Sequence, residues 1–167
     1  MNYDVIIAID PDVKKNGLAI LNMQTRNLSV DALEFPILMD RLRALPTAMN
    51  IDGMPTKVIV YVEAGYLNKP HWHMKDKDSK RVVSAKGNSV GRNHEVGRLI
   101  VAMAKHYGCN VEEVFPLKKC WKGPEGKITQ EEIGELTGLK ARTNQEMRDA
   151  ALIAWVKSGF PMRMKVR

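Results

Sequence analysis

Cysteine is scarce in this 167-residue chain, which has two such residues and no CxxC pair. Cys109 and Cys120 stand apart, so neither a disulfide framework nor a cysteine-based metal motif is expected. Long apolar runs are absent as well, because the longest, residues 5–9 and 58–62, are far too short to cross a bilayer. The first residues also lack the basic stretch and apolar region of a secretory signal. We therefore expect a cytoplasmic protein without membrane contact.

Internal repeats and low-complexity segments are likewise missing, so a repeat architecture is not expected. Hydrophobic residues make up 44% of the chain and charged residues 27%, which leaves ample apolar material for a core. The length is within the range of one globular domain. We expect a single domain over residues 1–167.

Basic residues outnumber acidic ones by 26 to 19, and part of the excess is concentrated in one segment, residues 69–98. That segment holds eight basic residues and three acidic ones. The basic residues are Lys69, Lys75, Lys77, Lys80, Arg81, Lys86, Arg92 and Arg98. Such a field attracts a phosphate backbone, which releases counterions when it is neutralised, and Lys86 and Arg92 are candidate DNA contacts. Charge alone leaves a solvated loop equally open as an interpretation.

Two continuous apolar runs, each ending in an acid, are typical of strands buried on both faces of a sheet. They are VIIAID, which ends at Asp10, and VIVYVE, which ends at Glu63. After the first run, LAILNM and LSVDAL predict two further strands of a meander. A short helix over residues 38–45 follows, and CNVEEVFP at residues 109–116 predicts a later strand. This order predicts an α/β fold whose mixed central sheet, a three-stranded meander followed by parallel strands, is flanked by helices.

The remaining segments predict a loop and two helices. Residues 67–87 are polar, basic and without periodicity, which predicts a mobile loop. Residues 91–107 carry apolar side chains on one helical face, and Gly108 is placed to end this long helix. Thr129 to Glu132 has the T-x-x-E form of a capping box that opens a brief helix.

Two further acids, Glu146 and Asp149, stand near the start of the last predicted helix, residues 143–159. Positions three apart share one face of a helix, so both carboxylates can point at one site. The residues expected to face the core from this helix are Leu152, Ile153 and Val156.

If this helix crosses the sheet near the ends of the two acidic strands, then Asp10, Glu63, Glu146 and Asp149 converge. Converging anions repel unless cations neutralise them, and hard oxygen ligands favour Mg²⁺, with Mn²⁺ as a substitute. Two such ions about 4 Å apart clamp the attacking and leaving oxygens of a phosphodiester. We therefore predict a catalytic site in which these four acids bind two metal ions.

Each acid also has a purely structural interpretation. Asp10 and Glu63 can simply end strands, and Asp149 can be a solvated acid of the first helical turn. For Glu146 the alternative is stronger, because Thr143 to Glu146 is itself a T-x-x-E capping box.

Several segments, in order along the chain, resemble the RuvC-type Holliday junction resolvases, a family with a ribonuclease H-like fold. IDPDVKKNG, from Ile9 to Gly17, looks like the family's D-P-G-x-x-x-T-G opening, and Val62-Glu63 matches its second acidic strand. NSVGRNHEVGRLI is similar to the segment leading into its long helix, and VFPLKKCWKGPEGKITQEEI to its lysine-bearing strand, loop and short helix. EMRDAALIAW resembles its closing D-x-x-D-A-x-A-x-A helix. The resemblance covers most of the chain and suggests a divergent bacterial or phage member.

The resemblance implies a role for each matching acid. Asp10 would bridge both metal ions, Glu63 would bind the ion on the leaving-group side, and Asp149 would bind the ion that activates water. Glu146 would assist.

The resemblance also implies three DNA contacts. Lys118 and Lys127 match basic positions that flank the family's substrate groove. Tyr66, three residues after Glu63, stands where the family has an aromatic that stacks on exposed bases. Ordinary surface lysines and a packing tyrosine are the alternative interpretations.

This sequence departs from the family's pattern at several positions. Asp12 replaces a glycine, Asn16 a threonine, and Glu146 an aspartate or histidine. Asp12 either adds a metal ligand or merely distorts the turn. His71 and His73 have no counterpart, and without paired cysteines they do not predict a zinc site.

The family resemblance implies a divalent-metal-dependent, structure-selective crossover junction endodeoxyribonuclease that cuts Holliday junctions or other branched DNA. It also implies a homodimer, since two symmetric nicks require two sites, and Met103 and Tyr107 are candidates for the shared surface. A ribonuclease H-like nuclease acting on RNA or RNA/DNA hybrid is an alternative, because the fold is common to both. A non-catalytic branched-DNA-binding module is another, although four placed acids would weaken phosphate binding.

Overall fold

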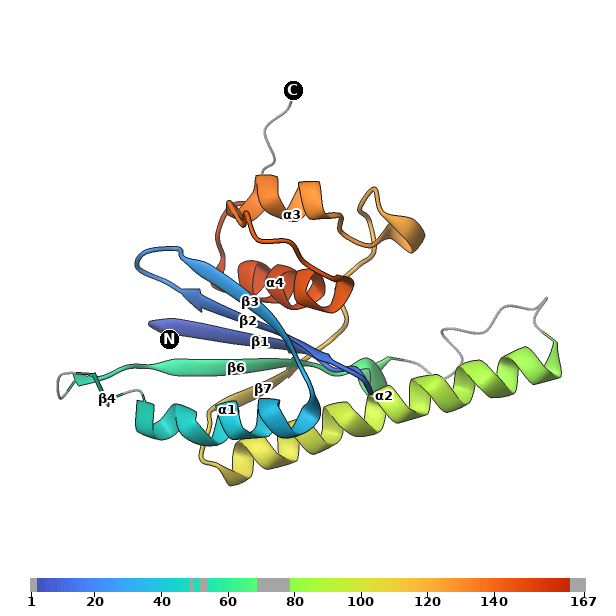
Figure 1. Ribbon diagram of the computed structural model, residues 1–167, viewed down its shortest axis with the longest axis horizontal. Coiled ribbons are helices and arrows are strands. Elements are labelled where there is room, and N and C mark those ends of the chain that lie inside the picture. The colour runs from blue at the N-terminus through green and yellow to red at the C-terminus, as the bar shows by residue number, and fades with distance from the viewer. Residues whose placement is uncertain (1–2, 49, 52–53, 69–78, 163–167) are drawn as a thin grey trace.

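A five-stranded sheet lies at the centre of the computed structural model, which describes residues 3–48, 50–51, 54–68 and 79–162 (Figure 1). The first three strands form an antiparallel meander, and the last two run parallel to the first, giving the order β3-β2-β1-β6-β7. The strands are β1 (Val5–Asp10), β2 (Asn16–Asn22), β3 (Leu28–Leu33), β6 (Val58–Glu63) and β7 (Val111–Val114). The predicted architecture, an α/β fold with a mixed central sheet flanked by helices, is confirmed.

Helices cover both faces of this sheet (Figure 1). On one face α4 (Gln145–Ser158) packs across β1, β2 and β3, with α3 (Gln130–Thr137) behind it. On the other face α1 (Phe35–Ala48) lies beside α2 (Lys80–His106). Two short strands, β4 (Asn50–Ile51) and β5 (Met54–Pro55), pair with each other outside the main sheet. The described chain also has two 3-10 turns, η1 (Gly65–Leu67) and η2 (Pro124–Gly126).

The central strand β1 divides the apolar core in two, because successive side chains of a strand point to opposite faces. Ile6 and Ala8 belong to the cluster under α4, whereas Ile7 and Ile9 belong to the cluster under α1 and α2. All four are nearly or fully buried, as the continuous apolar run predicts.

Two predicted boundaries on the α1 and α2 side were wrong. The helix expected at residues 38–45 extends over Phe35–Ala48. The loop expected at 67–87 ends earlier, because α2 begins at Lys80 and the Ser79 hydroxyl caps it by accepting from the backbone N–H of Val82. Residues 69–78 lie outside the described part of the chain.

The first half of α2 escaped prediction because it has no apolar stripe. It projects beyond the sheet and exposes most of its described side chains, so no packing imposes a helical period on its sequence (Figure 1). The helix ends as predicted, with Gly108 in the left-handed conformation at φ 82°.

The capping box of α3 is confirmed: Thr129 accepts from the backbone N–H of Glu132, and the Glu132 carboxylate accepts from the backbone N–H of Thr129. No helix in the described part of the chain has the length and apolar character that crossing a bilayer requires.

The start of α4 excludes the alternative interpretation of Glu146 as part of a capping box. The cap is Asn144, whose side chain accepts from the backbone N–H of Met147, while Thr143 pairs instead with the Gln130 side chain of α3. Glu146 therefore does not serve in a T-x-x-E capping box with Thr143. Its carboxylate is left available for another role.

The core-facing side of α4 was predicted in part. Leu152 and Ile153 are buried as expected, but Val156 is 37% exposed. The buried face includes Trp155 instead, whose indole N–H donates to the carbonyl of Pro161.

Candidate active site

Asp10 and Glu63 end neighbouring strands. β1 and β6 are parallel and in register up to the pair Ile9 and Val62, so both acids emerge at the same edge of the sheet. The carboxyl ends of parallel strands are where α/β proteins commonly build their sites.

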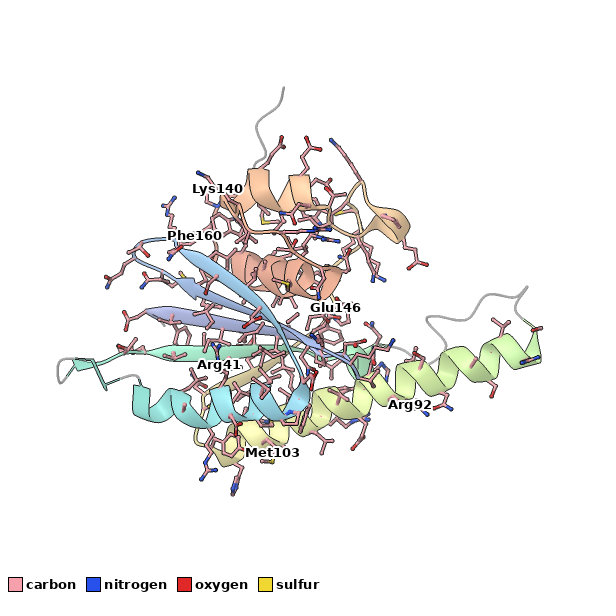
Figure 2. All side chains as sticks on the ribbon, viewed as in Figure 1. Arg41, Arg92, Met103, Lys140, Glu146 and Phe160 are labelled. Atoms are coloured by element: carbon pink, nitrogen blue, oxygen red, sulfur yellow. The ribbon has the colours of Figure 1, made fainter. Side chains whose placement is uncertain are left out.

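Gly17 allows the last helix to approach this edge. It pairs with Asp10 across β1 and β2, and a Cβ atom placed on it would lie 1.9 Å from the carbonyl oxygen of Glu146. No side chain fits in that space, so glycine lets the first turn of α4 rest directly on β2. Glu146 and Asp149 are thereby brought to the end of β1, where Figure 2 shows Glu146 at the sheet-facing end of α4.

A cavity of about 180 Å³ is lined by all four predicted acids, Asp10, Glu63, Glu146 and Asp149. The structure thus brings together residues that are up to 139 positions apart (149 − 10) in the chain. The prediction that they act as metal ligands stays a prediction. We call this cavity the acidic pocket.

Burial raises the pKa values of three acids of this pocket, Asp10, Glu63 and Asp149. Burial raises the pKa of Asp10 well above its ordinary value, and the nearby carboxylates of Glu63, Asp149 and Glu146 raise it further. The pKa of Glu63 is raised to about 7, mainly by burial and in second place by the negative charge of Asp149. The pKa of Asp149 is raised by burial, although the Gln145 side chain donates to its Oδ1 at 2.8 Å and opposes the shift.

This donor set fits a hard divalent cation, because carboxylate oxygens are the ligands such ions prefer and the cluster lacks enough positive charge of its own. In the described residues, no three acid, histidine or cysteine side chains are already arranged around a single ion position. Binding of one cation by three of these acids would therefore require their side chains to move from these positions.

Lysines line the same pocket. Lys118 and Lys127, both predicted as DNA contacts, are among its residues, and Lys127 lowers the pKa of Asp10, Glu63 and Asp149. Lys119, which sequence reasoning passed over, also lines the pocket and lowers the pKa of Glu63 and Asp149. Lys118 and Lys119 are adjacent in the sequence, but a loop has no periodicity from which to predict that both lysines line one pocket.

Tyr66 is held by protein contacts. Its hydroxyl donates to the Glu113 carboxylate at 2.6 Å, and the Arg98 guanidinium lies over its ring at 4.5 Å from the centroid. The His94 ring meets it edge-on. Burial and the hydrogen bond to Glu113 raise the Tyr66 pKa strongly. These contacts favour the packing interpretation, and base stacking stays a prediction.

The other predicted contacts lie elsewhere. Arg92 is exposed on α2 and is not one of the residues lining the acidic pocket (Figure 2). Lys86 belongs to the projecting half of α2, and His71 and His73 lie outside the described residues.

Asp12 shapes the turn after β1. Its Oδ1 accepts from the backbone N–H groups of Lys14 and Lys15, and its own N–H donates to Oδ1 of the buried Asn16. The Asn16 amide in turn donates to the carbonyl of Leu33. These hydrogen bonds show that Asp12 stabilises the turn rather than distorting it. Asp12 also lines the acidic pocket.

A second residue missed by sequence reasoning is Asn93 of α2, which lines the acidic pocket beside Asp10 and Glu63. A signal for it existed. Asn93 lies four residues before the buried Gly97 and seven residues before the buried Ile100, so all three share one face of the helix. Asn93 is therefore a polar residue on an otherwise apolar face.

With a chelator present, we expect the free energy of unfolding to fall as pH rises from about 4.5 to about 7. The unfolded chain releases the Glu63 proton near the ordinary pKa of 4.5, whereas the folded chain holds it until about pH 7, so rising pH favours the unfolded state. The shift corresponds to roughly 3 kcal/mol, and Asp10 acts in the same direction. Urea unfolding curves recorded at intervals of about one pH unit between about pH 4 and about pH 8 measure how the free energy of unfolding depends on pH. Glu63→Gln should flatten this dependence, and an unchanged slope in that variant would contradict the assignment.

No protein-family model and no curated protein matches this chain. Among solved structures, it is similar to RuvC from Thermus thermophilus in complex with a Holliday junction substrate, with a TM-score of 0.48 and 13% identity. That alignment covers 94% of this chain and 97% of the other. It is also similar to a second Thermus thermophilus RuvC structure, with a TM-score of 0.47, 17% identity, and coverage of 93% and 96% respectively.

Proposed function

We propose that this protein is a divalent-metal-dependent endonuclease that cuts four-way junctions or other branched DNA, as a divergent RuvC-type resolvase. The observation that carries the proposal is the acidic pocket, in which four carboxylates from β1, β6 and α4 meet beside three lysines. The motif resemblance of most of the chain supports the choice of branched DNA.

Asp10, Glu63, Glu146 and Asp149 would hold two Mg²⁺ ions, or Mn²⁺ in their place. Bound in this way, the ions would supply charge stabilisation for phosphodiester hydrolysis and a more acidic water. Asp10 is best placed to be shared, because its pKa is raised by all three other acids. Gln145 holds Asp149 in position through its 2.8 Å hydrogen bond.

The lysines of the pocket would bind the DNA backbone. Lys118 and Lys119 are exposed at its rim, whereas Lys127 is half-buried and interacts with the acids. Positive charge at this place neutralises the phosphates that flank a scissile bond, which positions a strand without reading its sequence. Arg92 on the projecting half of α2 would extend this basic surface, whereas Lys86 and the base-stacking role of Tyr66 stay predictions.

The direct test compares four synthetic substrates: a four-way junction, a linear DNA duplex, an RNA/DNA hybrid and single-stranded RNA. We expect Mg²⁺-dependent nicks near the branch point of the junction, none in the duplex, and no cutting with a chelator. Preferential cutting of hybrid or RNA would instead support a ribonuclease. Tight junction binding without any cutting in Mg²⁺ or Mn²⁺ would support a non-catalytic module.

We also propose that the protein acts as a homodimer, because two nicks related by the two-fold symmetry of a junction require two identical sites. The suggested interface residues Met103 and Tyr107 pack partly against the core cluster under α1 and α2, which favours a role in the core for both, and their place in a dimer interface stays a prediction. Multi-angle light scattering with junction DNA should show two chains per junction, and a persistent one-to-one complex would contradict the dimer.

A further inference from the structure

The side chain of Asn93 carries a buried oxygen that has no hydrogen-bond partner in the described part of the chain. Asn93 lines the acidic pocket and also a second cavity of about 190 Å³, and both cavities include Asp10 and Glu63 in their walls. The residue that carries this unsatisfied acceptor therefore lines both of the cavities that Asp10 and Glu63 share.

Asp12 determines which end of the Asn93 amide is unsatisfied. Nδ2 of Asn93 faces Oδ2 of Asp12 at 3.5 Å and donates to it. Turning the amide over would set its oxygen against the carboxylate, so that two acceptors would meet. The orientation with Oδ1 unpaired is therefore favoured by charge.

A buried carbonyl oxygen without a donor is unfavourable, and folded proteins pair nearly all such atoms. The ionised acids of the pocket cannot satisfy it, because carboxylates only accept hydrogen bonds. A hydrated divalent cation would bring what is missing, since it carries water whose O–H groups are strong donors.

We propose that Asn93 is a positioning residue of the cation site, whose Oδ1 accepts a hydrogen bond from water carried by the bound cation. This inference rests on the proposed function, because it requires a divalent cation at the four acids. Asp12 orients the Asn93 side chain by accepting a hydrogen bond from its amide nitrogen.

The proposal predicts opposite effects of one substitution on two properties. Asn93→Leu removes the unsatisfied oxygen at similar volume and loses only the long, 3.5 Å hydrogen bond to Asp12, so the melting temperature of the metal-free protein should stay equal or rise. The same change should weaken Mn²⁺ binding by roughly tenfold, the usual effect of losing an outer-shell partner. A merely structural asparagine would show the reverse: a lower melting temperature and unchanged Mn²⁺ affinity.

The experiment measures Mn²⁺ binding to the full chain without DNA, by calorimetry and by electron paramagnetic resonance, together with melting temperature in chelator. The matched control is Asn88→Leu, which makes the same change at an exposed position of the same helix and should alter neither property. A second variant exchanges the two partners, Asp12→Asn with Asn93→Asp. It keeps the net charge and places an acceptor at position 93, so it should restore most of the affinity.

Two failures are distinguishable. If the natural chain binds no Mn²⁺, the metal site of the proposed function fails, and the role of Asn93 fails with it. If the natural chain binds Mn²⁺ and Asn93→Leu binds it equally well, the proposed function stands and only the role of Asn93 is overturned.

Discussion

Asp10→Asn is expected to slow the cutting of a four-way junction by at least about a thousandfold, while junction binding stays the same or tightens. Asp10 interacts with Glu63, Asp149 and Glu146, so neutralising it removes the ligand best placed to be shared between cations. The basic surface that attracts DNA is unchanged, and the loss of one negative charge favours phosphate. Single-turnover cleavage and gel-shift binding, measured on the same junction, separate the two effects.

The matched control for this prediction is Asp40→Asn. Asp40 is exposed on α1, on the face of the sheet opposite α4, and should leave cutting unchanged. Glu63→Gln and Asp149→Asn should behave like Asp10→Asn, and Glu146→Gln should be milder. Near-normal cutting by Asp10→Asn would remove Asp10 from the catalytic site.

Gly17→Ala is expected to lower the free energy of unfolding by about 3 kcal/mol or more, and cutting should fall with it. The added Cβ would lie 1.9 Å from the carbonyl oxygen of Glu146 and 2.3 Å from its carbonyl carbon. Both are backbone atoms, so no side-chain rotation relieves the clash, and α4 must move away from β2. That movement displaces Glu146 and Asp149 from the acidic pocket. Urea denaturation with chelator measures the stability change.

Gly91→Ala is the matched control. Gly91 is exposed on α2, and a Cβ atom at that position meets no atom within 4 Å. Because alanine is a better helix former, the variant should be as stable as the natural chain or more stable by up to about 1 kcal/mol. If Gly17→Ala were equally harmless, the close approach of α4 to β2 would be wrong.

The four acids were predictable because each stands where a local pattern changes. Asp10 and Glu63 terminate apolar strands, and Asp149 follows Glu146 at helical spacing. Buried strands and helices leave apolar residues at regular intervals in the sequence, so their ends can be located from the sequence alone. Metal binding by the acids, and the activity itself, remain predictions.

The sequence by itself determined the sheet and the position of the acids along it, since continuous apolar runs and a capping box act over a few residues. Other features depended on segments far apart in the chain. Asn144 caps α4 in place of Thr143 because Gln130, from α3, pairs with Thr143. Lys119 and Asn93 join the pocket because a loop and a distant helix fold against the ends of β1 and β6. Such contacts leave no local period, and they arise only when the chain packs its helices onto both faces of the sheet.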